Sequence, residues 1–488
     1  YSFDVLWQMY VEAGYPRRRI AAAILDNNLF GAEIDARAVQ LASFALMMKA
    51  VEHDPGFLER KLREQDRKAA APGPGAGQQG AGRPRVTHVH SVVLEDLSPT
   101  EIAQAVRGAF GSEDSERASV GLEVNRVIED LRNADTFGSL IRVPAGTAEV
   151  FEAIARSIEE GRREVQLGSA DAQQWREAAG ICQVLEDSRY TTMVANPPYQ
   201  PEFPTIKHFA RNNYPDSYPD LCTMFIQRAA SLVVRRGSIG MITMHSWMFL
   251  KSYQKLRPWM LSAVSLENMA HLGTRAFDSI GGEVVQTTAF TLTNVSAEGT
   301  HRSVFLRMTE GTSEAIKDSV LRRAARSEDD PHRHTARNSD FARIPGRPIV
   351  YWASEGMLAA FKRGVSLAEV ARPKVGLQTG DNERFLRLWF EVSSSRSYLT
   401  ATSREDAEAS GARWFPHNKG GSFRKWWGNQ DYVINWENDG KEVWDFRPRS
   451  VVRNPDCYFK PCVSWSRVSS GELSVRSFPP GMSPNDVA

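Results

Sequence analysis

The first 295 residues alternate short apolar runs with longer segments of helical periodicity, which limits the folds open to the chain. In the longer segments apolar residues recur every three or four positions, as in "DARAVQLASFALMMKA" (35–50). A strand followed by an acidic turn and a helix is the unit of a parallel α/β sheet. The expected strands are 29–34, 86–97, 190–195, 237–244 and 264–273, with a terminal β-hairpin over 281–294. The alternation predicts a doubly wound, mostly parallel α/β fold.

Helical spacing is clearest at the start of the chain, where Phe3, Leu6, Trp7 and Tyr10 fall on one face of an amphipathic helix. The later helices that we expect are 36–50, 99–110, 121–133, 220–234 and one long polar helix over 148–186.

Composition divides the 488 residues into three parts. Residues 1–295 carry the alternation and form the expected catalytic domain. Residues 296–348 are polar and poor in aliphatic side chains, which is typical of a connecting segment. Residues 349–488 are rich in Trp, Gly, Arg and Asn without helical periodicity, and we expect a separate α+β domain there.

A glycine-rich stretch over 60–85 contains a formal match to the dinucleotide-binding fingerprint, Gly75-Ala-Gly77-Gln-Gln-Gly80. That fingerprint requires a strand before it and a helix after it. Here a charged helical tail precedes the match and "AGRPR" follows it. We therefore interpret 60–85 as an internal flexible linker.

Charge and composition exclude several classes of function. The formal net charge of +1 means that any nucleic-acid binding must come from local basic patches. The most apolar long segment, 229–250, is interrupted by Arg235 and Arg236, so we expect no membrane span and no membrane partner. Four scattered cysteines and the lack of a visible secretory signal favour a cytoplasmic location.

Two residue pairs resemble partial metal sites. His88 and His90 lie on one face of an expected strand, and Cys457 and Cys462 are close in sequence. Neither pair has further ligands nearby in the sequence, so we expect no metal site.

The stretch "YTTMVANPPYQ" ends a buried strand with Asn196, Pro197, Pro198 and Tyr199. In open α/β sheets, ligands bind outside the carboxyl ends of strands, where this turn lies. Two prolines remove two backbone donors and fix two φ angles, which leaves a rigid turn with outward carbonyls. The Asn196 side-chain oxygen and the Pro197 carbonyl then form two acceptors at a fixed separation, a pair suited to an exocyclic amino group.

An adenine N6 amine is a poor nucleophile because its lone pair is delocalised into the ring. If both N6 hydrogens are bound by these two acceptors, the nitrogen can pyramidalise and direct its lone pair at an electrophile. Tyr199 supplies a flat face for a base that has left the double helix. The alternative interpretation is that Pro197 and Pro198 simply end a strand.

The chain resembles the amino-methyltransferases that use S-adenosylmethionine, and more specifically the BREX phage-defence adenine-specific DNA methyltransferases of the PglX family. The resemblance spans nearly the whole chain. It is carried by "NNLFGAEIDARAVQLASFALMMKA", "ADTFGSLI", "VANPPYQ", "GSIGMITMHSWMFLKSYQKLR", "NMAHLGTRAFDSIGGEVVQTTAF", "GLQTGDNERFLRLWFEV" and "WFPHNKGGSFRKWWGNQDYVINWENDG". It implies a seven-stranded methyltransferase sheet followed by the first part of a DNA target-recognition domain.

The resemblance also implies roles for individual residues. Glu33, with Asp35 beside it, matches the acidic position that binds the cofactor ribose, although a surface acid is an alternative. Asp135 matches the carboxylate that binds the cofactor adenine amine, with Phe137 as a stacking neighbour. A helix N-cap is the alternative for Asp135. Asp220 matches the segment that lines the methionine end of the cofactor.

Further positions concern the DNA. Phe277 matches the second ring of a base sandwich, with core packing as an equal alternative. Lys419, Arg424 and Lys425 are the expected DNA contacts in 349–488, where basic residues interleave with aromatic ones. Of the tryptophans there (Trp414, Trp426, Trp427 and Trp436), we expect about half to build the core of the domain.

The family's Gly-rich cofactor loop belongs immediately before Tyr1, so the resemblance implies a chain truncated at both ends that binds S-adenosylmethionine poorly. The expected function is site-specific N6-adenine methylation of double-stranded DNA with base flipping, alongside other BREX proteins. Two alternatives stay open. One is a DNA-reading or partner-docking component without catalysis, and the other is the same chemistry acting on RNA or on protein glutamine.

Overall fold

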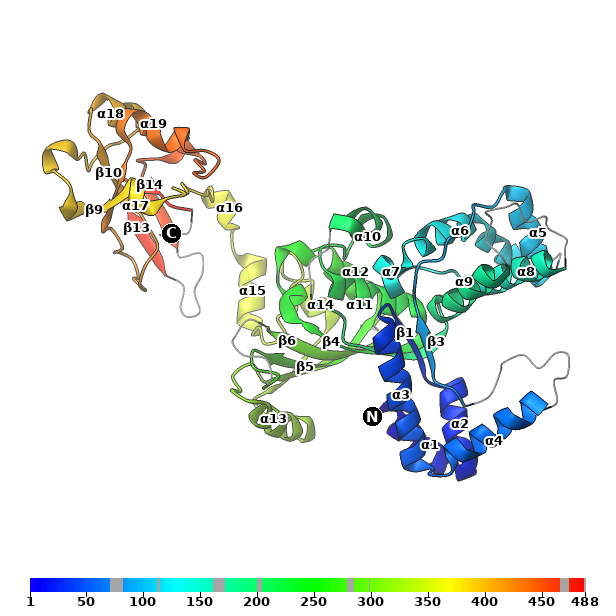
Figure 1. The fold of residues 1–488 in the computed structure, drawn as a ribbon. Helices are drawn as coiled ribbons and strands as arrows, with labels where there is room; N and C mark the ends of the chain where they lie inside the picture. Colours follow the sequence, from blue (N-terminus) through cyan, green and yellow to red (C-terminus); the bar gives the residue numbers. More distant parts are fainter. Residues whose placement is uncertain are drawn as a thin grey trace. The chain divides into compact units, whose positions relative to one another are not determined.

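The structure is a computed structural model that describes residues 1–70, 82–111, 115–160, 172–199, 204–278, 285–297, 299–465 and 474–486 (Figure 1). The chain divides into two units, Tyr1–Arg363 and Gly364–Ala488. The glycine fingerprint at 75–80 lies outside the described residues.

A six-stranded mixed sheet forms the centre of the first unit (Figure 1). Its order is β3-β4-β6-β5-β7-β8. The pairs β3/β4 and β5/β7 are parallel, and the other three are antiparallel. The strands are β3 (Tyr190–Ala195), β4 (Val233–Met244), β5 (Ser265–Gly273), β6 (Thr287–Thr293), β7 (Ser303–Arg307) and β8 (Arg333–Ala336).

The described residues thus do not form the single, mostly parallel seven-stranded sheet that was expected. Within 285–294, the described part of the expected hairpin over 281–294, one strand forms, β6, and it lies between β4 and β5. In this register Phe290 pairs with Met241 on one side and with Met269 on the other. All three side chains are buried in the same core, which favours insertion of the strand over a terminal hairpin.

A second, parallel pair consists of β1 (Phe30–Glu33) and β2 (Arg85–His88). The rings of Phe30 and Tyr190 lie 5.7 Å apart, so the first residues of β1 and β3 are neighbours. This ring contact joins the two-stranded pair to the edge strand of the six-stranded sheet.

Helices α1 (Ser2–Glu12), α2 (Arg17–Asn27) and α3 (Ala36–His53) pack around a small core that includes Phe3 and Trp7, as the amphipathic pattern predicted. The expected linker over 60–85 is wrong at both ends. Helix α4 (Phe57–Ala70) covers its first part, and β2 begins at its last residue. Phe57 is buried in the α1–α3 core, which ties the start of α4 to the fold.

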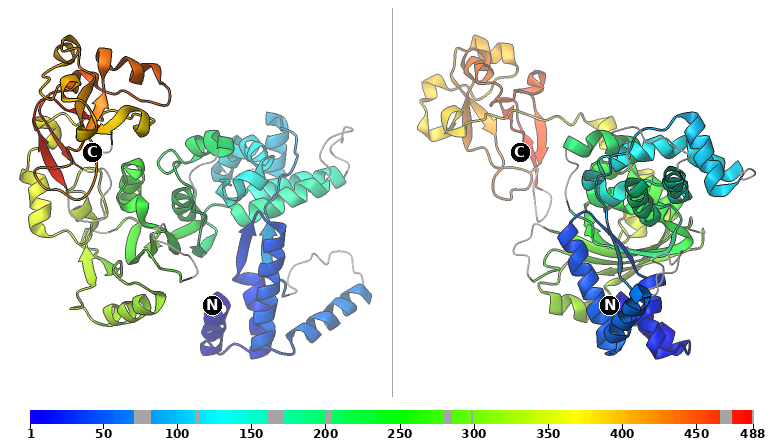
Figure 2. Two further views of the ribbon diagram at one scale, coloured as in Figure 1. Left: turned by 60° about the vertical axis from the view of Figure 1, so that its left-hand side comes forward. Right: turned by 45° about the vertical axis from the view of Figure 1, so that its right-hand side comes forward.

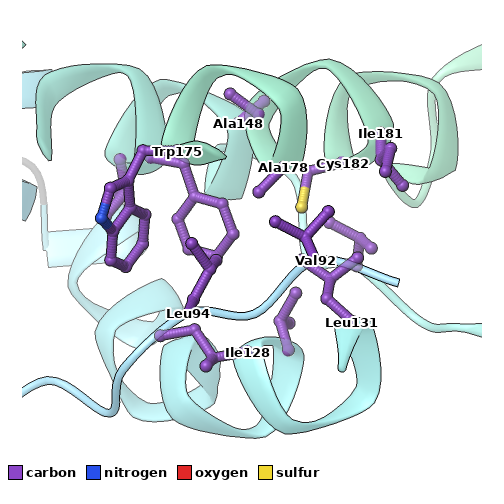
Figure 3. Close-up of a cluster of buried hydrophobic side chains, with 14 of the residues drawn as sticks. Val92, Leu94, Ile128, Leu131, Ala148, Trp175, Ala178, Ile181 and Cys182 are labelled. Atoms are coloured by element: carbon purple, nitrogen blue, oxygen red, sulfur yellow. The ribbon is translucent and has the colours of Figure 1, made fainter. Parts of the chain in front are cut away.

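Between β2 and β3 the chain forms a helical layer with its own apolar core (Figure 3). The expected long helix over 148–186 contributes two helices that pack on each other, α8 (Thr147–Glu159) and α9 (Ala172–Leu185). Phe151 and Trp175 meet edge to face, with ring centroids 5.2 Å apart. The other helices of the layer are α5 (Pro99–Phe110), α6 (Ser115–Leu131) and α7 (Ala134–Phe137).

Residues 296–348, expected as a connection, belong to the sheet of the first unit instead. They contain β7, β8, α13 (Glu314–Arg326) and α14 (Asn338–Phe341). Phe305 of β7 is fully buried and stacks on Tyr351 with ring centroids 4.3 Å apart. Several apolar residues of this polar segment, such as Phe305 and Phe341, belong to the core of the first unit. The average composition of the segment does not show this. Helix α15 (Glu355–Arg363) ends the unit.

The second unit combines short helices with a four-stranded sheet of order β14-β10-β11-β9 and a hairpin, β12-β13. Its strands are β9 (Leu386–Leu388), β10 (Trp414–Asn418), β11 (Tyr432–Asn435), β12 (Cys462–Trp465), β13 (Val475–Phe478) and β14 (Ser483–Pro484). Its helices are α16 (Leu367–Val370), α17 (Asn382–Phe385), α18 (Arg404–Ala409) and α19 (Glu437–Asp445), and Figure 2 shows the ribbon from two further sides. Trp436 is buried at 1% exposure, whereas Trp426 and Trp427 are exposed.

Candidate active site

The Asn196–Tyr199 turn follows directly on β3. Strand β3 ends at Ala195, which pairs with Met241. Beyond that point β4 continues to Met244, and among the described residues its strand partner there is β6, on its other side. The Met244 backbone is hydrogen-bonded to Cys222. Asn196 and Pro198 are exposed, Tyr199 is half-buried and Pro197 is buried.

A hydrogen bond closes the turn: the Tyr199 hydroxyl donates to Oδ1 of Asn196 over 2.9 Å. Burial raises the pKa of Tyr199, and the nearby Cys222 adds to the shift, so the hydroxyl stays protonated and able to donate. The amide oxygen of Asn196 has a second lone pair that remains available to a ligand. The bond thereby sets which way the amide faces.

Helix α11 (Leu221–Leu232) carries Cys222 in its first turn, and Cys222 contributes to the raised pKa of Tyr199. Asp220 is the N-cap and accepts a hydrogen bond from the Cys222 backbone N–H over 2.8 Å. Burial raises the pKa of Asp220, and hydrogen bonds from Cys222 and from the Tyr253 hydroxyl oppose that shift. Cys222 is thus hydrogen-bonded to Asp220 and also contributes to the pKa shift of Tyr199.

Glu33 and Asp35 follow directly on β1. Oε1 of Glu33 accepts from the backbone N–H groups of Ile34 and Asp35, over 2.8 and 3.0 Å. Asp35 is the N-cap of α3 and accepts from the N–H groups of Arg37 and Ala38. The Asp35 carboxylate is thus engaged in capping the N-terminus of α3. In the described part of the chain, Oε2 of Glu33 has no hydrogen-bond partner and is free for a ligand.

Asp135 lies in α7 and accepts a hydrogen bond from the Ser91 hydroxyl over 2.6 Å. The N-cap of this helix is Asn133, so the alternative reading of Asp135 as an N-cap is wrong. Gly138, three residues on, has a φ of +54° and a pro-Cβ position only 2.9 Å from Ile34 Cγ2. That close approach brings α7 against the residue that follows Glu33.

Phe137 stacks on Phe209 of α10 (Lys207–Asn213) with ring centroids 4.0 Å apart. This contact belongs to a small core that also contains Leu221 of α11. The core links the Asp135 segment with the helix that Asp220 caps. Within the first unit, the Gly138–Ile34 approach and this core connect the segments that carry Glu33, Asp135 and Asp220.

A largely apolar groove of about 870 Å³ crosses one face of the sheet and has Asn196 in its wall. Small residues of the central strands, such as Gly240, Ala270 and Ala289, leave room along its floor. Phe277 is half-buried past the end of β5 and does not line this groove. Its assignment to a base sandwich stays a prediction.

The donor set fits an adenosine-containing cofactor in its chemistry. A carboxylate oxygen of Glu33 is free at a strand end, where it could accept from vicinal hydroxyls. Asp135 is an exposed acceptor next to a ring, Phe137. Within the described ranges, no group of three or more His, Cys, Asp or Glu residues is arranged to hold a metal ion.

Sequence reasoning missed a hydrogen-bonded row of buried and half-buried side chains in the first unit: His245, His271 and Tyr351 are joined by hydrogen bonds of 2.7 and 2.9 Å. It also missed Ser91 and Tyr253, the partners of Asp135 and Asp220. These residues are far from their partners in sequence, so no local pattern could have found them.

In the second unit, Phe423, Arg424, Lys425, Trp426 and Trp427 are all exposed. The Lys425 ammonium lies 5.6 Å from the Trp426 ring centroid, and the Lys419 ammonium lies 4.4 Å from that of Tyr432. The backbone of Trp426 bonds to β13, since its N–H donates to Val475 and its carbonyl accepts from Ser477. A strand thus supports an exposed surface that combines cations with aromatic rings.

No helix among the described residues has both the length and the apolar composition that crossing a bilayer requires.

Residues 27–277 match the family described as Eco57I restriction-modification methylase. The chain is 35% identical over 494 aligned positions to the adenine-specific methyltransferase BrxX of Escherichia coli O9:H4 (strain HS), covering 98% of this chain and 38% of that protein. It is 34% identical to the adenine-specific methyltransferase PglX of Lacticaseibacillus casei (strain Zhang), covering 99% and 38% respectively. The chain thus spans well under half the length of these relatives.

Among solved structures, a Type IIL restriction-modification enzyme, MmeI, in complex with DNA overlaps 70% of this chain and 47% of its own, with a TM-score of 0.40 and 14% identity.

Proposed function

The chain belongs to the Eco57I restriction-modification methylase family, and from this premise we propose that it transfers a methyl group from S-adenosylmethionine to N6 of adenine in double-stranded DNA. The observation that carries the proposal is the turn at the end of β3, where the Tyr199 hydroxyl orients the exposed Asn196 amide.

The turn acts by holding the target amine. Oδ1 of Asn196 has one lone pair left after bonding Tyr199, and the Pro197 carbonyl is the second acceptor. Each accepts one N6 hydrogen, which favours a pyramidal nitrogen whose lone pair points away from the base. Tyr199 offers its ring as a stacking surface, which helps to offset the cost of unstacking the base from the duplex.

Glu33 and Asp135 are the residues that we assign to the cofactor, with Glu33 accepting from the ribose hydroxyls and Asp135 from the adenine amine. We also assign two further residues to the cofactor: Phe137 as a stacking neighbour of its adenine, and Asp220 at its methionine end. Asp35, which caps α3, we now assign to the helix rather than to the cofactor. When bound, S-adenosylmethionine supplies an electrophilic methyl group on a sulfonium.

DNA binding is assigned to the second unit, whose exposed Arg424 and Lys425 stand beside Trp426 and Trp427. Cations suit phosphate contacts, and exposed indole rings suit contacts with bases. Lys419 lies close to the Tyr432 ring, so it is a weaker candidate for a phosphate contact. In a BREX phage-defence system, acting with other BREX proteins in the cytoplasm, such methylation would mark host DNA.

The test uses the complete protein, a labelled methyl donor and a genome in which methylated adenines are mapped. We expect incorporation into adenine N6 at one sequence, and its loss by at least about 100-fold in Asn196→Ala, since a positioned polar partner is typically worth that much. Incorporation only into RNA or protein glutamine, or none at all, would overturn the proposal. DNA binding by Asn196→Ala controls for folding.

A further inference from the structure

The segments that follow β3 and β4 leave the six-stranded sheet at the same edge. The two strands are parallel neighbours, and Ala195 of β3 pairs with Met241 of β4. Because neighbouring parallel strands run in one direction, their carboxyl ends lie at one edge of the sheet. The Asn196–Tyr199 turn and the segment from His245 to Lys255 therefore both start at this edge of the first unit.

Tyr253 fastens the second of these segments to the N-terminus of α11. Its side chain is 7% exposed, and its hydroxyl is hydrogen-bonded to the Asp220 carboxylate. Asp220 caps α11 and accepts from the backbone N–H of Cys222. Cys222 is also hydrogen-bonded to the Met244 backbone and contributes to the raised pKa of Tyr199. The segment is thus held in place at the end of β4, where the turn also lies.

The part of the chain around this segment is basic, since no Asp or Glu occurs between Asp220 and Glu267. Two of its arginines are used inside the fold. Arg228 is buried and ion-paired with Asp187. Arg257 is buried and donates to backbone carbonyl groups. These two side chains therefore stabilise the unit itself.

Two further arginines, Arg235 and Arg236, lie at the opposite edge of the sheet. The Arg236 N–H donates to the carbonyl of Asn294, which follows the last residue of β6. Strand β6 runs antiparallel to β4, so its end lies at the start of β4, away from the turn. Both arginines are exposed.

The remaining two cations between Asp220 and Glu267 are Lys251 and Lys255, and both are exposed. They lie two positions before and two positions after Tyr253, so the anchored tyrosine holds the backbone of both. In the described part of the chain, neither ammonium group is paired with a carboxylate. The segment therefore presents two uncompensated positive charges at the edge where the turn lies.

A flipped nucleotide stays attached to its strand, so a base held at the turn brings its own 5′ and 3′ phosphates to this edge. We propose that Lys251 and Lys255 bind these phosphates and so hold the DNA strand on the first unit while its adenine is in the active site. Such contacts position a strand without reading its sequence. This inference rests on the proposed function, since it assumes that adenine is extruded to the Asn196–Tyr199 turn.

The test uses the complete protein and duplexes in which one phosphate is replaced by an uncharged methylphosphonate. The replacement is made in turn on the 5′ and on the 3′ side of the target adenine. We expect at least one of the two duplexes to lower kcat/KM of the unmodified protein about 10-fold, the size of a lost hydrogen bond to a charged group.

Lys251→Gln and Lys255→Gln each remove one charge and keep a polar side chain. The variant that lacks the contact should lose the same factor on unmodified DNA, and the matching methylphosphonate should then cost nothing further. Arg235→Gln combined with Arg236→Gln is the matched control, because it removes two exposed charges at the other edge of the sheet. This control should keep the full methylphosphonate effect.

The inference is overturned if neither methylphosphonate lowers kcat/KM of the unmodified protein, a criterion that requires no variant to fold. It is also overturned if, in both lysine variants, the methylphosphonate still costs the full factor. Those results leave adenine methylation itself intact. Absence of methylation from ordinary adenine would instead overturn the proposed function, and this inference with it.

Discussion

The hydroxyl of Tyr199 donates to the side-chain oxygen of Asn196 over 2.9 Å, so the ring proposed to stack on the base also orients the amide proposed to bind the amine. An isolated asparagine side chain can rotate its amide and offer either oxygen or nitrogen. Because the Tyr199 hydroxyl donates the hydrogen bond, the Asn196 amide must turn its oxygen, and not its nitrogen, toward Tyr199. One residue thus has two separable effects on the proposed reaction, which substitutions at position 199 can distinguish.

Tyr199→Phe keeps the ring and loses the orienting hydrogen bond, whereas Tyr199→Ala loses both. We expect kcat to fall about 10-fold in Tyr199→Phe, the size of one neutral hydrogen bond. Tyr199→Ala should lower it by a further 10- to 100-fold or so, because base stacking on an aromatic ring is worth roughly 1–3 kcal/mol. Single-turnover methylation measures both steps. Equal losses in the two variants would show that the ring is not used for stacking.

Glu33→Gln and Asp35→Ala should affect different properties. Glutamine retains a carbonyl oxygen for the N–H groups of Ile34 and Asp35 but lacks the charge, so we expect cofactor affinity to drop about 10-fold, as for a hydrogen bond to a charged group. Asp35→Ala removes the cap of α3 and should lower the free energy of unfolding by about 1 kcal/mol.

Isothermal titration with S-adenosylmethionine and urea unfolding of the complete protein measure these two effects. Asp35→Asn is the control, since asparagine also caps helices well. If Asp35→Asn lost cofactor affinity while its stability stayed normal, Asp35 would have to be assigned to the cofactor site after all.

Replacing Arg424 and Lys425 together by Ala should weaken DNA binding and reduce the slope of log affinity against log salt by up to about 2, since each neutralised phosphate contributes about 0.9. Fluorescence anisotropy at several salt concentrations measures the slope. Lys441→Ala is the matched control, because Lys441 is ion-paired with Asp445 on α19. An unchanged salt slope in the double variant would show that neither Arg424 nor Lys425 contacts the DNA phosphates.

Trp426→Ala should weaken DNA binding at every salt concentration without changing that slope, because an indole ring carries no charge. The ring is 68% exposed, so the substitution removes little packing within the unit. Retained thermal stability with unchanged affinity would contradict a role for Trp426 in binding.

Acid should destabilise the first unit through His271. Burial lowers its pKa from 6.5 to about 3 in the folded state. Between these values the unfolded chain binds a proton that the folded chain does not, so the stability present above pH 6.5 is lost as the pH falls toward 3. The slope from this residue approaches 1.4 kcal/mol per pH unit.

His417, buried in the second unit, has the same shift from 6.5 to about 3 and should add a similar slope there. Urea unfolding between pH 7 and 4.5 measures the effect, and His271→Gln should remove the part of the slope that comes from His271. A slope unchanged by that substitution would show that His271 is protonated in the folded state.

Several features of this protein could be predicted from local sequence because their causes are local. The strand 190–195 and the turn after it follow from residue types within ten positions, and so does the amphipathic first helix with Phe3 and Trp7 buried. The acidic residues after β1 were predicted as a pair, yet only the structure separates Glu33, with a free oxygen, from Asp35, which caps a helix.

Strand order and the hydrogen-bonded row of His245, His271 and Tyr351 were decided by tertiary structure. Strand β6 lies between β4 and β5 because Phe290 fits between Met241 and Met269, and no segment of sequence contains that pairing. His245, His271 and Tyr351 are separated by 26 and 80 positions along the chain. The energy of a buried hydrogen bond depends on which groups the fold brings within about 3 Å, and this distance is set by packing of the whole unit rather than by neighbours in sequence.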